Sequence, residues 1–215
     1  MIPAFYGFAR FTVWLALSLL WRFRAVGVRG VPLEGPLIVA CNHVSYFDPP
    51  ALGVAMPRPV TYMAKEELFR IPLLGPVIRW LGAFPVDRKR GDVAAIKAAI
   101  RILETGAALG IFPEGTRSPD GRLHRGKTGV ARMALASGAP VVPVGITGTD
   151  RALPRGSKLP RPHPVHIAFG PPITSVVPEN EAKDPARIRA LTDQVMAAIR
   201  ALSGQETAAE INPAA

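Results

Sequence analysis

The sequence contains only one cysteine, Cys41, among 215 residues. A single thiol excludes an intramolecular disulfide, and it excludes the thiolate-rich zinc sites that need several cysteines. Histidine is also scarce, since there are four and only His163 and His166 lie close together. Their segment has the pattern of a strand, in which a separation of three places side chains on opposite faces. We therefore expect no metal site.

Acidic residues are few compared with basic ones. Asp and Glu total 16 against 26 Lys and Arg, which gives a formal net charge of +10. This excess favours an anionic partner, of which nucleic acid, an anionic lipid surface and a phosphorylated substrate are the main kinds. The basic residues are hardly interleaved with aromatic ones and no nucleic-acid-binding module is recognisable, so we do not expect nucleic acid as the partner.

Long apolar runs are absent except near the N-terminus. Residues 2–21 are mostly apolar, but the uninterrupted part, 11–21, is half the roughly 20 residues that span a bilayer. A helix lying in the membrane interface fits this length better than a spanning helix. Such a helix would place three aromatic residues at headgroup depth: Tyr6, Trp14 and Trp21. A cleaved signal peptide and a core helix are the alternatives, but we expect residues 1–24 to form a membrane-associated helix.

After residue 24, short apolar runs alternate with helical segments. The predicted strands, each bounded by Gly or Pro, are 36–42, 59–64, 82–88, 108–115, 140–148 and 164–173. The predicted helices are 49–56, 91–106, 126–139 and 184–204. This alternation predicts an α/β fold with a largely parallel sheet flanked by helices. We expect one domain over residues 25–203 and a disordered tail over 204–215.

The first predicted strand ends in Asn42-His43, and an aspartate follows five residues after the histidine. Asp48 precedes two prolines, so it is expected to cap a helix with Pro49 at the first helical position. From the loop before this helix, His43 can turn back to the Asp48 carboxylate and keep its other ring nitrogen as a general base. Taken alone, this spacing is weak evidence for a catalytic pair. An aspartate that caps the helix and a histidine that bonds to loop carbonyls explain it more simply.

Two neighbours of His43 are candidate nucleophiles. Ser45 lacks the Gly-x-Ser-x-Gly turn that exposes the serine of many hydrolases. Cys41 points the same way as His43 if both lie on a strand, and a Cys–His pair can form an acyl-enzyme. The interpretation we favour is that Cys41 is a small buried residue at the end of the strand.

Two other strand ends carry arginines. In FPEGTRS, Arg117 offers a planar fork of donors suited to phosphate, Thr116 adds a hydroxyl, and Gly115 lets the backbone approach a ligand closely. Glu114 would repel a phosphate, so it is expected to orient an arginine or accept a substrate hydroxyl. Arg88 also follows a strand directly. Two arginines at neighbouring strand ends predict a phosphate clamp.

Four blocks of sequence, in this order, resemble the glycerophospholipid acyltransferase family, and within it the 1-acylglycerol-3-phosphate acyltransferases. They are NHVSYFDP, AKEELFRIPLLGPVIRWLGAFPVDR, FPEGTRS and VVPVGI. The resemblance places the catalytic pair on His43 and Asp48. It places the binding of the glycerol phosphate on Arg88, Glu114, Gly115 and Arg117. Lys65 matches a family lysine close to the reacting carbonyl, where it would stabilise an oxyanion.

The resemblance implies transfer of a fatty acyl group from an acyl-CoA or acyl-carrier protein thioester to the free hydroxyl of 1-acylglycerol 3-phosphate. The product is phosphatidic acid, and no cofactor is needed besides the acyl donor. We expect the protein at an anionic membrane surface, on the cytoplasmic face of the inner membrane, with the basic loop 151–161 as a second contact. Two rival hypotheses stay open: another lysolipid or glycolipid acceptor, and a non-catalytic membrane protein that binds phospholipid.

Overall fold

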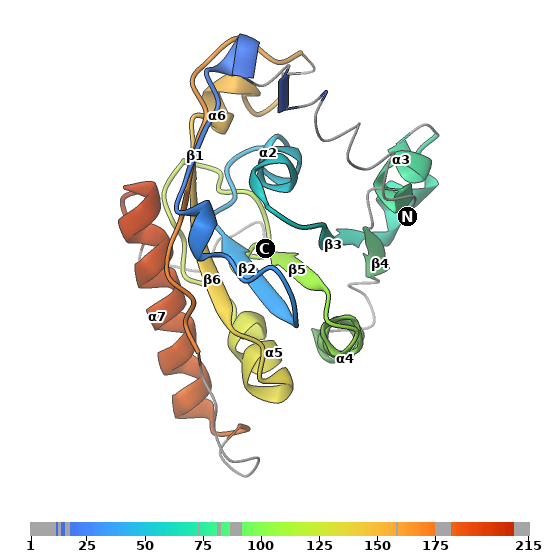
Figure 1. Cartoon of the computed structure of the whole chain (residues 1–215), viewed down its shortest axis with the longest axis vertical. Coiled ribbons are helices and arrows are strands. Elements are labelled where there is room, and N and C mark those ends of the chain that lie inside the picture. The colour runs from blue at the N-terminus through green and yellow to red at the C-terminus, as the bar shows by residue number, and fades with distance from the viewer. Residues whose placement is uncertain are drawn as a thin grey trace.

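The structure is a computed structural model that describes residues 12, 14–15, 18–72, 74–80, 83–86, 92–157, 159–174 and 182–208. In this part of the chain, seven strands form one sheet in the order β1-β7-β6-β2-β5-β3-β4 (Figure 1). The strands are β1 (Arg24–Val26), β2 (Leu37–Cys41), β3 (Val60–Lys65), β4 (Phe84–Val86), β5 (Ala108–Ile111), β6 (Val141–Thr147) and β7 (His166–Phe169).

Every pair of neighbouring strands is parallel except β6 and β7. The predicted α/β fold with a largely parallel sheet is therefore confirmed, and each of the six predicted strands is present. The sequence did not predict β1, which pairs with β7 at the edge of the sheet. Three residues with an exposed arginine are too short to give a strand pattern, so only the pairing with β7 defines this element.

Helices of the described residues flank the sheet. They are α2 (Asp48–Ala55), α3 (Leu74–Trp80), α4 (Asp92–Glu104), α5 (Gly129–Ser137), α6 (Thr149–Ala152), α7 (Pro185–Ser203) and the 3-10 helices η1 (Val28–Gly30) and η2 (Glu66–Arg70). The four predicted helices are confirmed as α2, α4, α5 and α7. The Asp184 side chain caps α7 by accepting from the backbone N–H of Ala186, and Gly204 ends the helix in a left-handed conformation.

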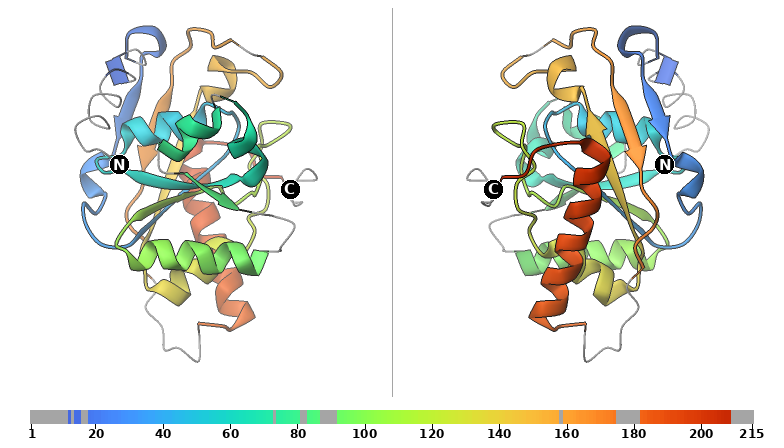
Figure 2. Two further views of the ribbon diagram at one scale, coloured as in Figure 1. Left: turned by 90° about the vertical axis from the view of Figure 1, so that its right-hand side faces the viewer. Right: turned by 90° about the vertical axis from the view of Figure 1, so that its left-hand side faces the viewer.

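The central strand β2 is buried on both faces. Leu37, Val39 and Cys41 pack into the cluster that contains α2, whereas Ile38 and Ala40 pack into the cluster that contains α5 and α7. Figure 2 shows α7 lying along one face of the sheet. Because neither face of β2 meets water, its sequence is continuously apolar instead of alternating. This burial fixes the position of the polar residues that follow the strand.

The N-terminal segment reaches the core at Trp21, which is only 8% exposed. Its indole donates to the carbonyl of Arg161 at 2.6 Å, and its ring packs against Phe47 with the centroids 5.4 Å apart. The prediction that Trp21 lies at headgroup depth is therefore wrong, because the fold buries the ring. Trp14 is partly exposed, and Tyr6 lies outside the described residues.

The predicted membrane-associated helix stays a prediction. Residues 12, 14–15 and 18–21 are helical, while the remainder of residues 1–21 lies outside the described part of the chain. Among the described helices, none is both long enough and apolar enough to cross a bilayer.

The segment after α7 differs from the prediction of a disordered tail. Leu123 donates its backbone N–H to Glu206 at 2.8 Å, and Ala208 donates to the carbonyl of Leu123 at 3.0 Å. Gln205 also donates its side-chain amide to Gly121. The prediction is wrong for residues 204–208 because pairing with another loop, invisible in the local composition, orders them. Residues 209–215 lie outside the described part.

Candidate active site

Two segments with polar residues meet where β2 and β5 end. These strands are parallel neighbours, with Ala40 in register with Ile111, so the segments that follow them leave the sheet at the same edge. Polar groups of separate segments gather at this edge in open α/β sheets. His43 and Glu114 are consequently adjacent although 71 positions separate them in the sequence.

Asn42 ties the end of β2 to β6. Its side-chain amide donates to the carbonyl of Ile146 at 2.8 Å, and its side-chain carbonyl accepts from the N–H of the same residue at 2.8 Å. Asn42 is completely buried, and both hydrogen-bonding ends of its amide group are paired. The Asn42 side chain thus continues the pairing of β2 with β6 beyond the end of the strand. It fixes the backbone directly before His43, the first residue of the loop.

His43 faces Asp48, as the sequence predicted. Its Nδ1 lies 2.7 Å from Oδ2 of Asp48, and its ring stacks on Phe112 with the centroids 4.0 Å apart. The His43 side chain is 14% exposed, whereas the Asp48 side chain is fully buried. No hydrogen bond within the described part of the chain engages Nε2 of His43. The carboxylate thus orients the ring and leaves the second nitrogen for another partner.

The Asp48 carboxylate does not cap α2, contrary to the prediction. Asp48 is the first residue of the helix, and its Oδ2 accepts the backbone N–H groups of Val44 and Ser45 at 2.8 Å each. These donors lie in the loop before the helix, so the carboxylate closes the loop on itself. Three donors converge on one buried carboxylate oxygen, which rigidly positions the aspartate.

The two candidate nucleophiles beside His43 are buried. Ser45 donates its hydroxyl to the carbonyl of Leu153 at 2.8 Å and also accepts from the N–H of Phe47. Cys41 is completely buried in the core. Burial, and then the charge of Asp48, raises the pKa of the Cys41 thiol well above its ordinary value. The interpretation of Cys41 as a small buried residue is confirmed, and both side chains have structural positions.

Glu114 holds the backbone around His43. Its Oε1 accepts the N–H of His43 at 3.0 Å, and its Oε2 accepts the N–H of His124 at 3.0 Å. Ser118 donates its N–H to the carbonyl of His43 at 2.7 Å, so both backbone groups of His43 are bound by the loop after β5. Glu114 is completely buried, and its two carboxylate oxygens bond to backbone instead of the predicted arginine or substrate hydroxyl.

A second histidine, His124, is buried and closes the same loop, and the sequence did not predict its role. Nε2 of His124 lies 2.9 Å from Oδ1 of Asp120, which also accepts the hydroxyl of Ser118. The hydrogen bond from His124 is the largest cause that lowers the pKa of Asp120 to about 2. His124 carries no motif that distinguishes it in the sequence. Its role follows from the turn at 118–122, which brings the histidine back to the aspartate.

Arg117 lies beside the loop that carries His43. Its guanidinium carbon is 3.5 Å from the centroid of the Tyr46 ring, and Tyr46 lies between His43 and Asp48 in the sequence. A guanidinium stacks on an aromatic ring through its flat face, and its N–H donors lie in the plane of the group. Thr116 is half-buried on the same turn. The predicted phosphate-binding turn is therefore next to the His43–Asp48 pair.

Two predicted site residues are only partly placed or not placed. Lys65 is the last residue of β3 and lies in register with Val86 of β4, at the edge where the other site residues gather. The side chain of Lys65 lies outside the described part of the structure, and so does the whole of Arg88. Their predicted contacts with substrate stay predictions.

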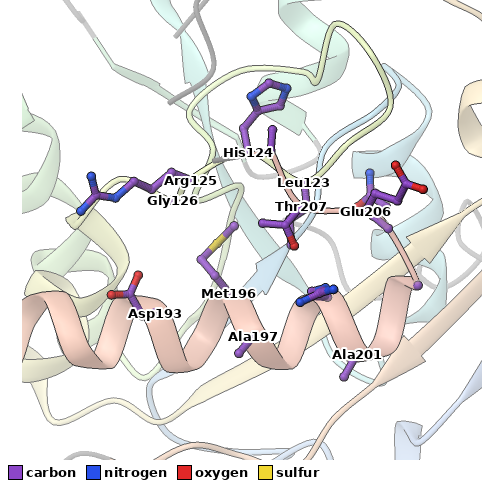
Figure 3. Close-up of a pocket in the computed structure, with 14 residues that line it drawn as sticks. Leu123, His124, Arg125, Gly126, Asp193, Met196, Ala197, Ala201, Glu206 and Thr207 are labelled. Atoms are coloured by element: carbon purple, nitrogen blue, oxygen red, sulfur yellow. The ribbon is translucent and has the colours of Figure 1, made fainter. Parts of the chain in front are cut away.

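A separate hollow of about 800 Å³ lies behind the loop after β5. It is lined by residues 123–126, by α7 and by residues 204–208 (Figure 3). Met196 of α7 points into the space below this loop, while the ring of His124 is directed away from α7 (Figure 3).

Comparison with known proteins identifies this arrangement. A family model described as Acyltransferase matches residues 22–147, which is more than half of the chain. The chain belongs to the Acyltransferase family. The family resemblance stated from the sequence is confirmed, and the matched region of this acyltransferase includes both the His43–Asp48 pair and the turn at 114–117.

Several similar proteins carry a more specific name. The acyltransferase is 33% identical over 170 residues to the 1-acyl-sn-glycerol-3-phosphate acyltransferase of Bacillus subtilis, covering 78% of this chain and 82% of that protein. A protein of the same name from Pseudomonas aeruginosa is 27% identical over 95% of this chain and 76% of its own length. The chain covers only 42% of the chloroplast enzyme LPAT1 of Arabidopsis thaliana, to which it is 31% identical over 68% of its own residues.

A solved structure has the same fold. The 1-acyl-sn-glycerophosphate (LPA) acyltransferase PlsC of Thermotoga maritima superimposes with a TM-score of 0.74 and 29% sequence identity. The match covers 92% of this acyltransferase and 78% of the Thermotoga chain.

The burial of Glu114 predicts a pH-dependent stability of the acyltransferase. Burial is the main cause that raises the pKa of Glu114 from 4.5 to about 7, against the opposing effect of the N–H groups it accepts. Between pH 4.5 and about 7 the folded protein holds a proton that the unfolded chain releases. Rising pH therefore lowers the free energy of unfolding in this window, by at most about 1.4 kcal/mol per pH unit.

Urea unfolding of wild type and Glu114→Gln at several pH values from 4.5 to 8 checks this prediction. We expect the difference in free energy of unfolding between them to change across the window, because glutamine does not titrate. The exposed Glu67, replaced by glutamine, is the control and should leave the pH profile unchanged. A constant difference between Glu114→Gln and wild type would contradict the raised pKa.

Proposed function

We propose that this acyltransferase transfers a fatty acyl group from a thioester to the free hydroxyl of 1-acylglycerol 3-phosphate, forming phosphatidic acid. The observation that carries the proposal is the pair of His43 and Asp48. Nδ1 of His43 lies 2.7 Å from Oδ2 of Asp48, the carboxylate is buried and the imidazole is partly exposed. The shared name of the Bacillus and Pseudomonas relatives supports the choice of acceptor.

In this proposal His43 is the general base. Nε2 removes the proton from the acceptor hydroxyl as its oxygen attacks the thioester carbonyl carbon. The new C–O bond forms, the C–S bond breaks, and the proton passes from the imidazolium to the leaving thiolate. Asp48 holds Nδ1 so that Nε2 faces the hydroxyl, and its negative charge stabilises the imidazolium. No residue of the protein is acylated, consistent with the burial of Cys41 and Ser45.

The remaining predicted residues orient the substrates. Arg117, stacked on Tyr46, binds the phosphate of the acceptor, and Arg88 completes the clamp. Lys65 stabilises the oxyanion that develops on the thioester carbonyl. Glu114 acts on this chemistry through the backbone, because it fixes the N–H of His43 and so the direction of the ring. The donor is an acyl-CoA or an acyl-carrier protein, and the reaction requires no metal or further cofactor.

Thiol release tests the function directly. The purified protein is mixed in detergent with a long-chain acyl-CoA, with or without 1-acylglycerol 3-phosphate, and the free thiol and the phosphatidic acid are measured. We expect thiol release that depends on the lysolipid, with one phosphatidic acid formed for each thiol. If release is absent with both acyl-CoA and acyl-carrier protein donors and with every lysolipid tried, the protein is not an acyltransferase of lysolipids.

The same enzyme is proposed to bind an anionic membrane surface from the cytoplasmic side of the inner membrane. Leu19 and Leu159 are large apolar side chains that are 74% and 76% exposed, and exposed apolar residues that share one surface are typical of membrane-binding sites. Leu19 belongs to the N-terminal helix and Leu159 to the loop after α6. Trp21 connects these two segments, because its indole donates to the carbonyl of Arg161. The end of the N-terminal helix and the loop after α6 lie together at the top of Figure 1.

The positive charge of these two segments also supports their binding to an anionic membrane. The same two segments carry three exposed arginines: Arg22, Arg155 and Arg161. Each basic residue near an anionic leaflet contributes about 1 kcal/mol to binding. A truncation that tests the anchor should stop before Trp21, because this residue belongs to the core of the fold.

Replacing Leu159 by aspartate should weaken binding to vesicles that contain anionic lipid about tenfold or more. Burying a leucine side chain in hydrocarbon contributes roughly 1.5–3 kcal/mol, and the added negative charge faces an anionic surface. Sedimentation with vesicles measures the bound fraction. Val93→Asp is the control, since Val93 is 67% exposed on α4, which lies away from this surface. Equal binding of Leu159→Asp and Val93→Asp would contradict the assignment of the surface.

A further inference from the structure

The side chain of Lys127 lies across Gly115 in the turn after β5. A β-carbon built on Gly115 would lie 3.0 Å from Cε, 3.2 Å from Cδ and 3.3 Å from Nζ of Lys127. Gly115 also has a φ of +79°, which disfavours other residues. The sequence predicted that this glycine lets a ligand approach the backbone closely. In the structure, the stem of Lys127 lies beside it, and the binding of substrate at Gly115 stays a prediction.

The backbone of Lys127 is held against the same turn. Its N–H donates to the carbonyl of Pro113 at 2.8 Å, and the N–H of Gly115 donates to the carbonyl of Phe112 at 2.9 Å. Phe112 is the residue on which the His43 ring stacks. The lysine is therefore anchored at its backbone and along its stem, one residue from the aromatic ring that supports the predicted base.

The ammonium group of Lys127 has no acidic partner among the described residues. No ion pair in this part of the chain involves it, and the residue is exposed. The neighbouring carboxylate of Glu114 is buried and accepts two backbone N–H groups. Fixing a lysine side chain costs conformational entropy, and here no salt bridge within the protein offsets this cost. Such a lysine suits an anion that binds from solution.

A second cation, Arg117, belongs to the turn that Lys127 lies across. Arg117 follows Gly115 by two residues, so the two α-carbons are separated by less than about 7.6 Å. The guanidinium of Arg117 stacks on Tyr46, in the loop between the two members of the His43–Asp48 pair. Both side chains are long enough for one phosphate group beside this turn to accept hydrogen bonds from the ammonium and the guanidinium together.

We propose that Lys127 binds the phosphate of the acceptor together with Arg117, which makes it a determinant of selectivity for phosphate monoesters. This inference rests on the proposed function. A phosphate monoester carries between one and two negative charges at neutral pH, because its second pKa is near 6. Two cations beside one turn therefore favour it over the singly charged diester of a lysophosphatidylglycerol.

The variant Lys127→Met tests the proposal, because methionine keeps an apolar stem over Gly115 and removes the charge. The exposed Lys97 of α4, replaced by methionine, is the matched control. We expect the KM for 1-acylglycerol 3-phosphate to rise about tenfold or more in Lys127→Met, with the KM for acyl-CoA and the Tm unchanged. We also expect its preference for 1-acylglycerol 3-phosphate over lysophosphatidylglycerol to fall by a similar factor.

Two results would overturn the proposal. If only the KM for acyl-CoA rises, Lys127 binds the phosphates of the donor. If neither KM changes, Lys127 has only a packing role against Gly115. Binding of glycerol 3-phosphate, measured by calorimetry without any acyl donor, separates this proposal from the proposed function. Weaker binding in Lys127→Met supports the phosphate site even if no acyl transfer is found, and equal binding in both proteins rejects it.

Discussion

Replacing His43 by alanine should lower kcat by a factor of about 10² to 10⁴, which is the usual contribution of a positioned general base. The acceptor hydroxyl then keeps its proton during attack on the thioester, so the transition state loses its main route for proton transfer. The KM for the acceptor should change little, because in the proposed site Arg117 and the turn at 114–117 bind the phosphate independently of the ring. Steady-state thiol release at several acceptor concentrations measures both quantities.

His166→Ala is the control for this variant. His166 is an exposed histidine on β7, outside the proposed site, and its loss should leave kcat unchanged. Circular dichroism and Tm establish that His43→Ala is folded, which we expect because the ring is partly exposed at the end of β2. A folded His43→Ala variant with wild-type kcat would remove His43 from the chemistry.

Replacing Asp48 by asparagine should also reduce kcat, by about 10²-fold or more. Oδ2 of Asp48 faces only donors: Nδ1 of His43 and the N–H groups of Val44 and Ser45. If the asparagine places its amide nitrogen in this position, two sets of donors face each other and no hydrogen bond forms. If it places its amide oxygen there, the negative charge that stabilises the imidazolium is missing. In both orientations the proton transfer at Nε2 is weakened.

The same variant should also be less stable by about 1–3 kcal/mol, because the buried carboxylate closes the loop before α2. Activity and urea unfolding are therefore measured together, at a temperature where the variant is folded. Asp150→Asn, at an exposed aspartate of α6, serves as the control for both measurements. If folded Asp48→Asn kept more than a tenth of the wild-type kcat, Asp48 would have a structural role alone.

The fold class was accessible from local patterns. Each strand of the parallel core is a short apolar run bounded by Gly or Pro, and α7 has a capping aspartate, a proline at its start and a glycine at its end. The short edge strand β1 and the ordered segment 204–208 were not accessible. Both exist through backbone pairing with residues far away in the sequence, and such pairing leaves little trace in composition.

The candidate site divides in the same way. The sequence by itself determined that His43 and Asp48 could meet, because five residues of loop before a helix start allow the contact. It also determined the position of Arg117, since a strand end followed by Pro-Glu-Gly-Thr-Arg presents an arginine at the edge of the sheet. These inferences depend on residues that are neighbours along the chain.

Only the tertiary structure decided what the other side chains do. Glu114 bonds to the backbone of His43 and His124, Trp21 enters the core, and Lys127 lies across Gly115. The physical reason is that burial and hydrogen-bond partners depend on which strands are neighbours in the sheet. A carboxylate three residues before an arginine in the sequence can therefore be directed inward, while a lysine ten residues after that arginine lies across the turn.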